Sequence, residues 1–433
     1  MNFEKVNAGI NSYIKWLNYY MNRFKYYRMW VLYAGGHWEN ISFTDHRKCF
    51  RMMMIIYEEI RTMKKFKRVK CFVRISLLMV QAFILCLPSS PAPACSAAAR
   101  RERAVKKEEE RQKETEITIS AAGDCTFGSD QSSPSSVNFY AVKRKKAPDY
   151  FFKKVKKIFE RDDLTLVNFE GTLTKRTTRE PKKYAFRGNP GYVKILKEGS
   201  VEAAAFANNH CRDFGSGSYT DTIQCFRKAG VIYSSYSKVG IYKVKDKKIG
   251  MISVNGLENI SSVKKLVADG MEKLKKQRAD LCIVSMHAGI EHVYSVSAEQ
   301  KSIARYAVDR GADLVLGHHP HNLQGIEKYK GVYIVYSLGN FCFGGNTNPP
   351  DKDTMIFQQT FVFEKRKMKK GKGTVKIIPC SVSSTDGINN YQPAPAKGKK
   401  RTRILNKLDK MCLPMGLTLK NKKGELTDSL YTK

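Results

Sequence analysis

Histidines gather in one part of this chain. Six of its eight histidines fall between His210 and His321, in three tight clusters. The carboxylates Asp124 and Glu170 precede these histidines along the chain, and the amides Asn208 and Asn209 stand directly before His210. Imidazole, carboxylate and amide groups together make a mixed nitrogen and oxygen ligand set, which suits Zn, Mn or Fe ions better than calcium. An ion held in this way lowers the pKa of a bound water and polarises a phosphoryl or carbonyl oxygen.

These polar residues share one position relative to short apolar runs. The runs are residues 117–123, 164–170, 201–209, 281–287 and 312–319, and each is typical of a strand buried on both faces. In an open α/β sheet, ligands bind beyond the carboxyl ends of the strands, because loops from neighbouring strands meet there. Five strand ends therefore predict one shared metal site. Its candidate ligands are Asp124, Glu170, Asn209, His210, His287, His319 and His321.

Several neighbouring residues are candidates for contacting the substrate or supporting the ligands. Taken singly, His287 is also compatible with a structural imidazole, and Asn208–Asn209 with a turn. The coincidence of five strand ends favours one site over five separate explanations. Glu291 and His292 follow His287 on what we expect to be the same loop. The residues interpreted as substrate-binding are Asn168, Glu291, His292 and His318.

Other catalytic chemistries lack their motifs. No G-x-S-x-G follows a strand, as a serine hydrolase of that type requires, and neither a P-loop nor a G-x-G-x-x-G nucleotide motif is present. No C-x-x-C pair occurs among the eleven cysteines, which excludes a zinc ribbon or a thioredoxin-like site. Cys125, Cys211 and Cys342 lie beside the candidate ligands, and we interpret them as small packing residues.

The chain is strongly basic, with 77 Lys and Arg against 40 Asp and Glu and a formal net charge of +37. No window combines a recognition-helix pattern, an aromatic RNA-binding signature or zinc-finger spacing, so sequence-specific nucleic-acid binding is not expected. Positive charge spread along the whole chain favours attraction to an anionic polymer or to lipid headgroups.

The segment 63–99 has the order of a secretory signal. Six Lys and Arg residues between Lys64 and Arg74 precede a short apolar run at 75–87, and a Pro, Ser and Ala stretch follows. Its internal position leaves two explanations: translation begins at Met63, which we favour, or the segment is an internal signal-anchor. A buried core helix is the other alternative. Residues 1–62 receive no fold. We expect an extracytoplasmic protein, secreted or anchored at the cell envelope.

Strands that alternate with helices predict an α/β domain over 116–382. Helical patterns cover 150–159, 219–228, 263–276 and 298–308. Later segments read as hairpins and meander strands, so the sheet is expected to be mixed. We interpret residues 100–115 as a charged linker. Residues 383–433 are expected to form a basic C-terminal extension with at most one helix, near 401–412.

Seven segments carry a resemblance to a known family. They are AAGDCTFGSD, LVNFEGTLT, YAFRGNP, FANNHCRDFG, HAGIEH, GADLVLGHHPHNLQGIEKY and VYIVYSLGNFCF, in this order. Over residues 117–382 the chain resembles the capsule-synthesis protein CapA family, whose members are associated with poly-γ-glutamate production. That family is similar in fold to calcineurin-like metallophosphoesterases. The resemblance implies a four-layer sandwich of two mixed sheets flanked by helices.

The resemblance also implies roles for single residues. Asp124 matches the first metal-binding aspartate, and Glu170 stands where a carboxylate bridges or flanks the metals. Thr126 stands where the related phosphoesterases have a histidine. The resemblance therefore does not decide between one metal ion and two. The remaining matches are the Asn209–His210 pair, the isolated His287, and the paired His319 and His321, with His318 as an alternative to His319.

The sequence is compatible with two functions. The first is an exported, metal-dependent hydrolase-like protein in capsule or poly-γ-glutamate synthesis, release or attachment, with His287, Asn209 and His210 as catalytic residues. Its expected partners are an anionic polymer and components of a membrane synthase. The second is a non-catalytic accessory protein of the envelope that binds the polymer or the synthase.

Overall fold

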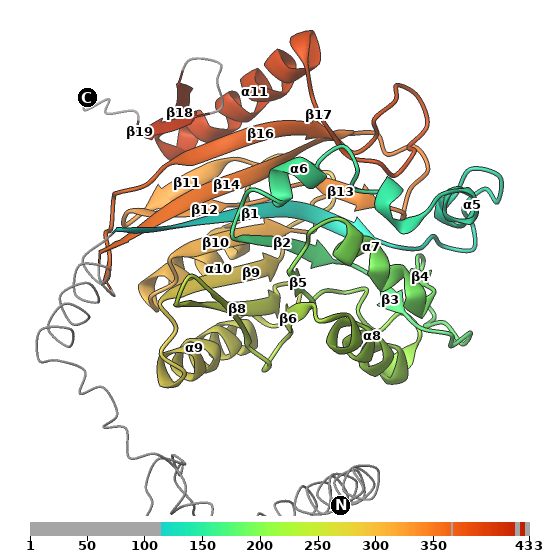
Figure 1. The fold of residues 1–433 in the computed structure, drawn as a ribbon, viewed down its shortest axis with the longest axis horizontal. Helices are drawn as coiled ribbons and strands as arrows, with labels where there is room; N and C mark the ends of the chain where they lie inside the picture. The colour runs from blue at the N-terminus through green and yellow to red at the C-terminus, as the bar shows by residue number, and fades with distance from the viewer. Residues whose placement is uncertain (1–113, 365–366, 421–424, 429–433) are drawn as a thin grey trace, which may run out of the picture. The chain divides into compact units, whose positions relative to one another are not determined.

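Two mixed β-sheets face each other in the computed structural model, and helices cover their outer faces (Figure 1). The structure describes residues 114–364, 367–420 and 425–428. The signal segment, residues 1–62 and nearly all of the expected linker lie outside the described residues, and those expectations stay predictions. Within the described residues, no helix is both long enough and apolar enough to cross a membrane.

The larger sheet carries the first half of the site. Its strands lie in the order β18 (Leu417–Lys420), β19 (Glu425–Asp428), β16 (Val375–Ser381), β14 (Asp353–Glu364), β1 (Thr115–Thr126), β2 (Leu164–Phe169), β5 (Ala203–Ala205) and β6 (Ile232–Ser234). The last four run parallel, whereas β14 and β16 are antiparallel to their neighbours. Three further strands join this sheet at β1, β14 and β16: β13 (Asn340–Phe343), β15 (Lys367–Met368) and β17 (Ala394–Pro395).

The smaller sheet carries the second half. Its order is β11 (Ile326–Tyr329), β12 (Val332–Val335), β10 (Leu314–His318), β9 (Leu281–His287), β8 (Lys247–Asn255) and β7 (Gly240–Val244). The four central strands are parallel, and antiparallel hairpins form both edges. A separate parallel pair consists of β3 (Thr172–Leu173) and β4 (Arg187–Gly188). The expectation of mixed sheets is therefore confirmed.

Alternating side chains create the layers. In β2, Leu166 points into the core between the two sheets, whereas Val167 points to the helices outside the larger sheet. In β9, Ile283 and Val284 divide in the same way between the central core and the helices of the smaller sheet. Both faces of these two central strands are thus apolar, as the continuous runs predicted. The four-layer α/β sandwich is confirmed.

The helices outside the larger sheet are short, except for α8. They are α5 (Phe139–Lys145), η1 (Pro148–Tyr150), α6 (Lys156–Phe159), η2 (Pro190–Val193), α7 (Lys194–Glu198) and α8 (Gly215–Ala229). The smaller sheet is covered by α9 (Ile260–Lys276) and α10 (Ala298–Asp309). A capping box between Ser297 and Gln300 begins α10, because each side chain binds the backbone of the other residue.

Two expected elements differ from those observed. The helical pattern at 150–159 becomes turns and the four-residue α6, because Phe151, Phe152 and Val155 enter the outer core without a continuous helix. The strand expected at 201–209 is limited to β5. Beyond β5 the backbone turns toward the site, and the Asn208 side-chain amide donates to the Phe169 carbonyl at 2.8 Å.

The C-terminal region is part of the fold as far as the structure describes it. Helix α11 (Gly398–Cys412), followed by η3 (Leu413–Met415), places apolar side chains in the core between the sheets. Arg403 on the same helix forms an ion pair with the buried Asp353 of β14. The expectation of an extension beginning at residue 383 is corrected accordingly. The α11 side chains in this core are Ile404, Leu405, Leu408 and Cys412.

Candidate metal centre

The carboxyl ends of the central strands from both sheets meet at one rim. Asp124 lies near the end of β1, and Glu170 follows β2 directly. The loop after β5 carries Asn209 and His210. From the smaller sheet, His287 ends β9, and the loop after β10 brings two further histidines. The strand-end rule predicted a single sheet edge, whereas these candidate ligands come from two sheets that face each other.

Asp124 is fully buried and surrounded by donors. Its Oδ1 accepts a hydrogen bond from Asn168 Nδ2 at 2.8 Å, and its Oδ2 accepts one from the His319 backbone N–H at 3.3 Å. Its Oδ2 also lies 3.3 Å from His321 Nδ1. Burial raises the pKa of Asp124, but hydrogen bonds and charges from His318 and His321 outweigh it, so the pKa falls well below its usual range. Asp124 is an ionised carboxylate.

The pKa of Glu170 shifts in the opposite direction to that of Asp124. It is fully buried, and neither carboxylate oxygen has a hydrogen-bond partner among the described residues. Three imidazole nitrogens face its Oε1 beyond hydrogen-bond reach: His321 Nε2 at 3.7 Å, His210 Nε2 at 3.8 Å and His287 Nε2 at 3.9 Å. Burial raises the pKa of Glu170 well above its usual value. A buried carboxylate without partners is costly, and a bound cation removes that cost.

A chain of side chains fixes His287. Its Nδ1 faces Asn168 Nδ2 at 3.2 Å, and its Nε2 lies 2.8 Å from Asn209 Oδ1. Since the amide Nδ2 is a donor and Oδ1 an acceptor, this pairing puts the proton on Nε2. His319 Nδ1 lies 3.2 Å from the same Nε2. Asn168 therefore links Asp124 to His287 and sets the tautomer of that imidazole.

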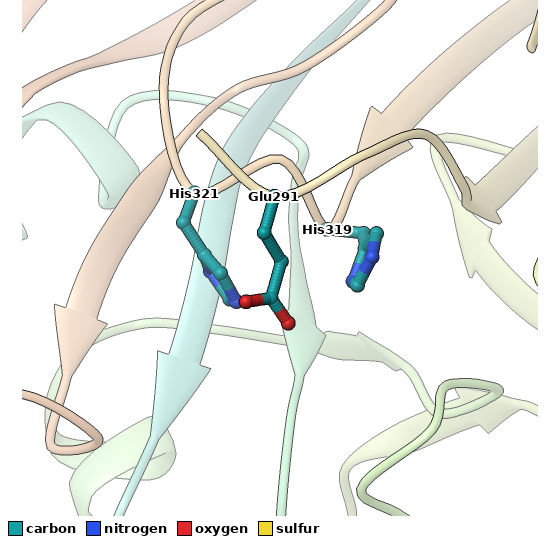
Figure 2. A group of neighbouring side chains, drawn as sticks. All are labelled: Glu291, His319 and His321. Carbon is teal, nitrogen blue, oxygen red and sulfur yellow. The ribbon is translucent and has the colours of Figure 1, made fainter. Parts of the chain in front are cut away.

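The structure contains two groups of three side chains, and within each group the ligand atoms lie within 4.8 Å of one another. Figure 2 shows the group of Glu291, His319 and His321. Asp124, Glu170 and His321 form the inner set, and all three side chains are buried. Glu291, His319 and His321 form the outer set. His319 and His321 both have positive φ angles, of 99° and 58°, and these turn the two rings toward the site. The sequence had assigned Glu291 to the substrate and not to the metal.

The imidazoles differ in protonation. Burial, together with the charge of His321, lowers the pKa of His319 to about 4. Burial also lowers the pKa of His287 well below its usual value. Burial acts in the same direction on His321, but the Glu170 charge and the Asp124 hydrogen bond outweigh it and raise its pKa to about 9. At neutral pH, His319 is ready to bind a metal, whereas His321 must first release a proton. His287 is also neutral, but its two nitrogens are engaged by Asn168 and Asn209.

His210 stands slightly apart from both ligand sets. Its Nδ1 lies 2.7 Å from Asp213 Oδ2, and Lys182 Nζ donates to Asp213 Oδ1 at 2.8 Å. The Phe186 backbone N–H also donates to Asp213, which is fully buried. The sequence analysis missed Asp213 and Lys182, although Asp213 stands only three positions after His210. The fixed acceptor places the His210 proton on Nδ1 and leaves Nε2 as an acceptor that faces the site.

We expect Asp213→Asn to reduce any activity of this site by about 10- to 100-fold, because residues that orient a catalytic or metal-binding histidine have effects of this size. The Asp213 carboxylate raises the pKa of His210 against the larger effect of burial. Removing it should move the acidic limb of the pH–rate profile to lower pH. Asp221→Asn is the matched control, since Asp221 binds Thr174 and Arg176 instead. An unchanged profile for Asp213→Asn would contradict the role.

A cavity of about 280 Å³ opens beside the ligands. Glu291 and His292, both exposed, line it, and their role as substrate contacts stays a prediction. Asn168 and His318 do not line it, because both are buried behind the ligands. His318 Nδ1 lies 3.4 Å from Asp124 Oδ1, so this ring supports the ligands and does not face the substrate. The other lining residues include His210, His321, Asn340, Phe186 and Phe343.

Asn340 is a second residue that the sequence analysis missed. Its Oδ1 lies 2.9 Å from His321 Nδ1, and β13 holds it beside β1, where it pairs with Asp124. The close approach of β1 to the segment that leads into β13 depends on Gly123, because a Cβ at this residue would lie 1.8 Å from the Gly339 carbonyl oxygen. The only signal in the sequence was the SLGNF segment of the resemblance.

The residues present fit a divalent transition metal. The donor set combines carboxylate oxygens with neutral imidazole nitrogens, and Glu170 has two buried oxygens without partners among the described residues.

The chain is similar in sequence to proteins named for capsule or polymer synthesis. The PGA biosynthesis protein CapA of Bacillus subtilis (strain 168) is 29% identical over 292 residues, which are 62% of this chain and 73% of that protein. The capsule biosynthesis protein CapA of Bacillus anthracis is 30% identical over 262 residues, 52% of this chain and 60% of that protein. A probable polyglutamine synthesis accessory protein of Mycobacterium tuberculosis is 26% identical over 208 residues, 41% of this chain and 55% of that protein.

Among solved structures, a hypothetical protein from Thermus thermophilus aligns over 61% of this chain and 99% of its own length, with 13% identity and a TM-score of 0.37. The sequence profile of the bacterial capsule synthesis protein PGA_cap family matches residues 118–345, which contain every candidate ligand described above. This chain therefore belongs to the bacterial capsule synthesis protein family PGA_cap.

Proposed function

We propose that this protein is a metal-dependent, hydrolase-like protein of the cell envelope that acts in the synthesis, release or attachment of an anionic polymer such as poly-γ-glutamate. The observation that carries the proposal is Glu170: a fully buried carboxylate without a partner among the described residues, faced by three imidazoles and set next to ionised Asp124. The names of the Bacillus relatives support the role in capsule synthesis.

One or two ions of Mn, Zn or Fe would be held by the converging side chains. When bound, such an ion supplies polarisation of a carbonyl or phosphoryl oxygen and a lowered pKa for water. The residues that would hold it are Asp124, Glu170, Asn209, His287, His319 and His321.

The chain's own residues supply the proton transfer. His210 lines the cavity, and burial lowers its pKa, so the ring is neutral at pH 7. Its Nδ1 is held by Asp213, which leaves Nε2 free to accept a proton from a nucleophilic water and to return it to the leaving group. Asn209 holds His287 in one orientation, and the polymer backbone would lie in the cavity beside both loops.

The charge of the chain bears on its partners. A net charge of +37 would attract a polyanion, and that attraction would weaken as salt rises. Export through the segment 63–99 and contact with a membrane synthase are part of the same proposal. Mass spectrometry of the mature N-terminus tests the export step: a start near residues 95–100 supports signal cleavage, and peptides from 1–62 in the mature protein contradict a start at Met63.

A non-catalytic accessory role is the second candidate. The name of the mycobacterial relative supports it. Thr126 supports it as well, because it stands where the resemblance has a histidine, and its buried hydroxyl has no hydrogen-bond partner among the described residues. Under this alternative, the protein binds the polymer or a synthase partner without cleaving a bond.

Polymer cleavage by the purified full chain separates the two candidates. We expect poly-γ-glutamate incubated with the protein and Mn²⁺ to become shorter, as measured by size-exclusion chromatography. A chelator, or the double change Asp124→Ala and His319→Ala, should stop the reaction. If the double variant binds the polymer and supports capsule output as well as the wild type does, the accessory role holds instead.

Metal uptake should depend steeply on pH. His321 has a pKa of about 9 in the metal-free protein, so below that pH it must release a proton to bind an ion. The apparent affinity should therefore rise about tenfold per pH unit from neutral pH and level off above about pH 9. Calorimetric titration in two buffers of different ionisation enthalpy measures the protons released. Release of none at pH 7 would contradict the protonated state of His321.

A further inference from the structure

Helix α11 has one apolar face and one strongly basic face. Its fifteen residues include six Lys and Arg and a single Asp. The apolar residues at helical spacing pack into the core between the sheets, which turns the basic residues to the other side of the helix. Six residues of α11 line one pocket on that side: Lys399, Thr402, Arg403, Asn406, Lys407 and Lys410.

Four cations of this face form one stripe. Lys399, Arg403, Lys407 and Lys410 stand three or four positions apart, which places them on one side of a helix. At 1.5 Å per residue, the stripe is about 17 Å long. Lys399 and Lys410, at its ends, are exposed, and neither forms an ion pair within the part of the chain that the structure describes. Their charges are therefore available to a partner.

The middle of the stripe is joined to the rim of the cavity beside the metal centre. Lys407 Nζ lies 2.5 Å from Asp351 Oδ2, and the Tyr294 hydroxyl donates to the same oxygen at 3.0 Å. Asp351 directly follows Pro350, which lines the cavity. Tyr294 lies on the loop between β9 and α10, and Glu291 of that loop lines the cavity too. A polymer chain that leaves the cavity on this side therefore meets α11.

The cavity itself offers a polyanion no cationic lysine or arginine. Its lining, as far as the structure describes it, contains neither residue type, and the exposed Glu291 adds a carboxylate. A bound metal would engage the bond at the reaction centre. Every other unit of a polycarboxylate brings a further negative charge, and cations are needed outside the cavity to offset these charges, because like charges repel.

We propose that the basic stripe of α11, formed by Lys399, Arg403, Lys407 and Lys410, binds the polycarboxylate chain outside the cavity. This inference rests on the anionic polymer of the proposed function and gives that polymer a place on the molecule. A γ-linked glutamate has two more backbone carbons than an α-linked residue, so its extended repeat grows from about 3.6 Å to about 6 Å. Residues four apart on a helix are also separated by about 6 Å along the axis. The spacing of carboxylates along an extended chain is therefore close to the spacing of cations along the stripe.

Calorimetric titration of the full chain with poly-γ-glutamate, at low salt and with a chelator present so that cleavage does not interfere, tests the assignment. Lys399→Gln combined with Lys410→Gln removes the two cations without ion pairs and leaves the other two in place. We expect the Kd for the polymer to rise about three- to tenfold, because two exposed charge contacts are lost. Lys153→Gln combined with Lys154→Gln is the matched control, since these two exposed lysines lie outside α11. The control should keep the Kd within about twofold of the wild type, because salt screens distant charges.

An equal loss of affinity in both double variants would show that net charge alone attracts the polymer, and it would overturn the assignment. An unchanged Kd in the α11 variant would overturn it too. If the α11 variant loses binding to vesicles of phosphatidylglycerol but keeps the polymer, the stripe binds lipid headgroups and the assignment is wrong. If the α11 variant alone loses affinity while the wild type with Mn²⁺ leaves the polymer uncut, the stripe is supported and the hydrolase proposal is removed.

Discussion

Asp124→Asn is expected to abolish tight metal binding and, with it, any metal-dependent cleavage, lowering activity by at least about 10³-fold. Asp124 is the one inner ligand whose pKa lies well below its usual range, so it supplies a full negative charge next to His321 and Glu170. Asparagine keeps the shape of the side chain but removes that charge. The measurement is metal content by mass spectrometry after dialysis, together with polymer cleavage.

Asp130→Asn is the matched control for this change. Asp130 is also buried, and it accepts hydrogen bonds from the Ser132 and Ala185 backbone N–H groups and pairs with Arg179. It lies in neither ligand set. We expect this variant to lose stability but to retain the metal. Equal metal content in Asp124→Asn and Asp130→Asn would show that Asp124 is not a ligand.

Glu170→Gln should make the metal-free protein more stable and the metal-bound protein less so. At pH 7 the raised pKa of Glu170 means that folding disfavours its ionised form. The contribution of Glu170 to the free energy of unfolding is fully present below the pKa that this carboxyl has in the unfolded chain. It is lost as the pH rises through the higher pKa that the carboxyl has in the folded protein. A neutral amide avoids that loss, and we expect the free energy of unfolding to rise by about 1–3 kcal/mol without metal.

The same substitution should remove the stabilisation that metal provides. In the wild type, an ion present at 100 times its Kd adds about 2.7 kcal/mol to the free energy of unfolding. Denaturant unfolding with and without Mn²⁺, at pH 7 and at pH 5, measures both effects. The difference in stability between variant and wild type should shrink toward pH 5. A variant that is less stable without metal, yet stabilised by Mn²⁺ like the wild type, would contradict this role for Glu170.

The fold and the rim positions of several candidate residues could be predicted from the sequence because they follow from local patterns. Runs such as 281–287 are apolar on both faces, and a polar residue at the end of such a strand must lie at the rim of the sheet. His287 and Asp124 were found in this way. The short β5 and the turns at 151–155 were not, because tertiary contacts of Asn208 and Phe152 decide them.

Other parts of the site depend on geometry that no strand pattern contains. Glu291 comes within 4.8 Å of ligand atoms of His319 and His321 from a loop in which the next residue, His292, has a positive φ angle. Asp213 meets His210 through a turn, and its role is visible only once both side chains have positions. The basic residues of α11 suggested an extension, whereas its apolar residues at helical spacing, such as Ile404 and Leu408, close the core between the sheets.

The most direct test of the metal centre is a crystal structure of the full chain grown with Mn²⁺, with anomalous differences measured for the ion. We predict an anomalous peak about 2.0–2.3 Å from ligand atoms of Asp124, Glu170 and His321. Crystals grown in Mn²⁺ that show no peak at these residues, and in which water or protein donors bind the Glu170 oxygens instead, would contradict a metal centre at this place.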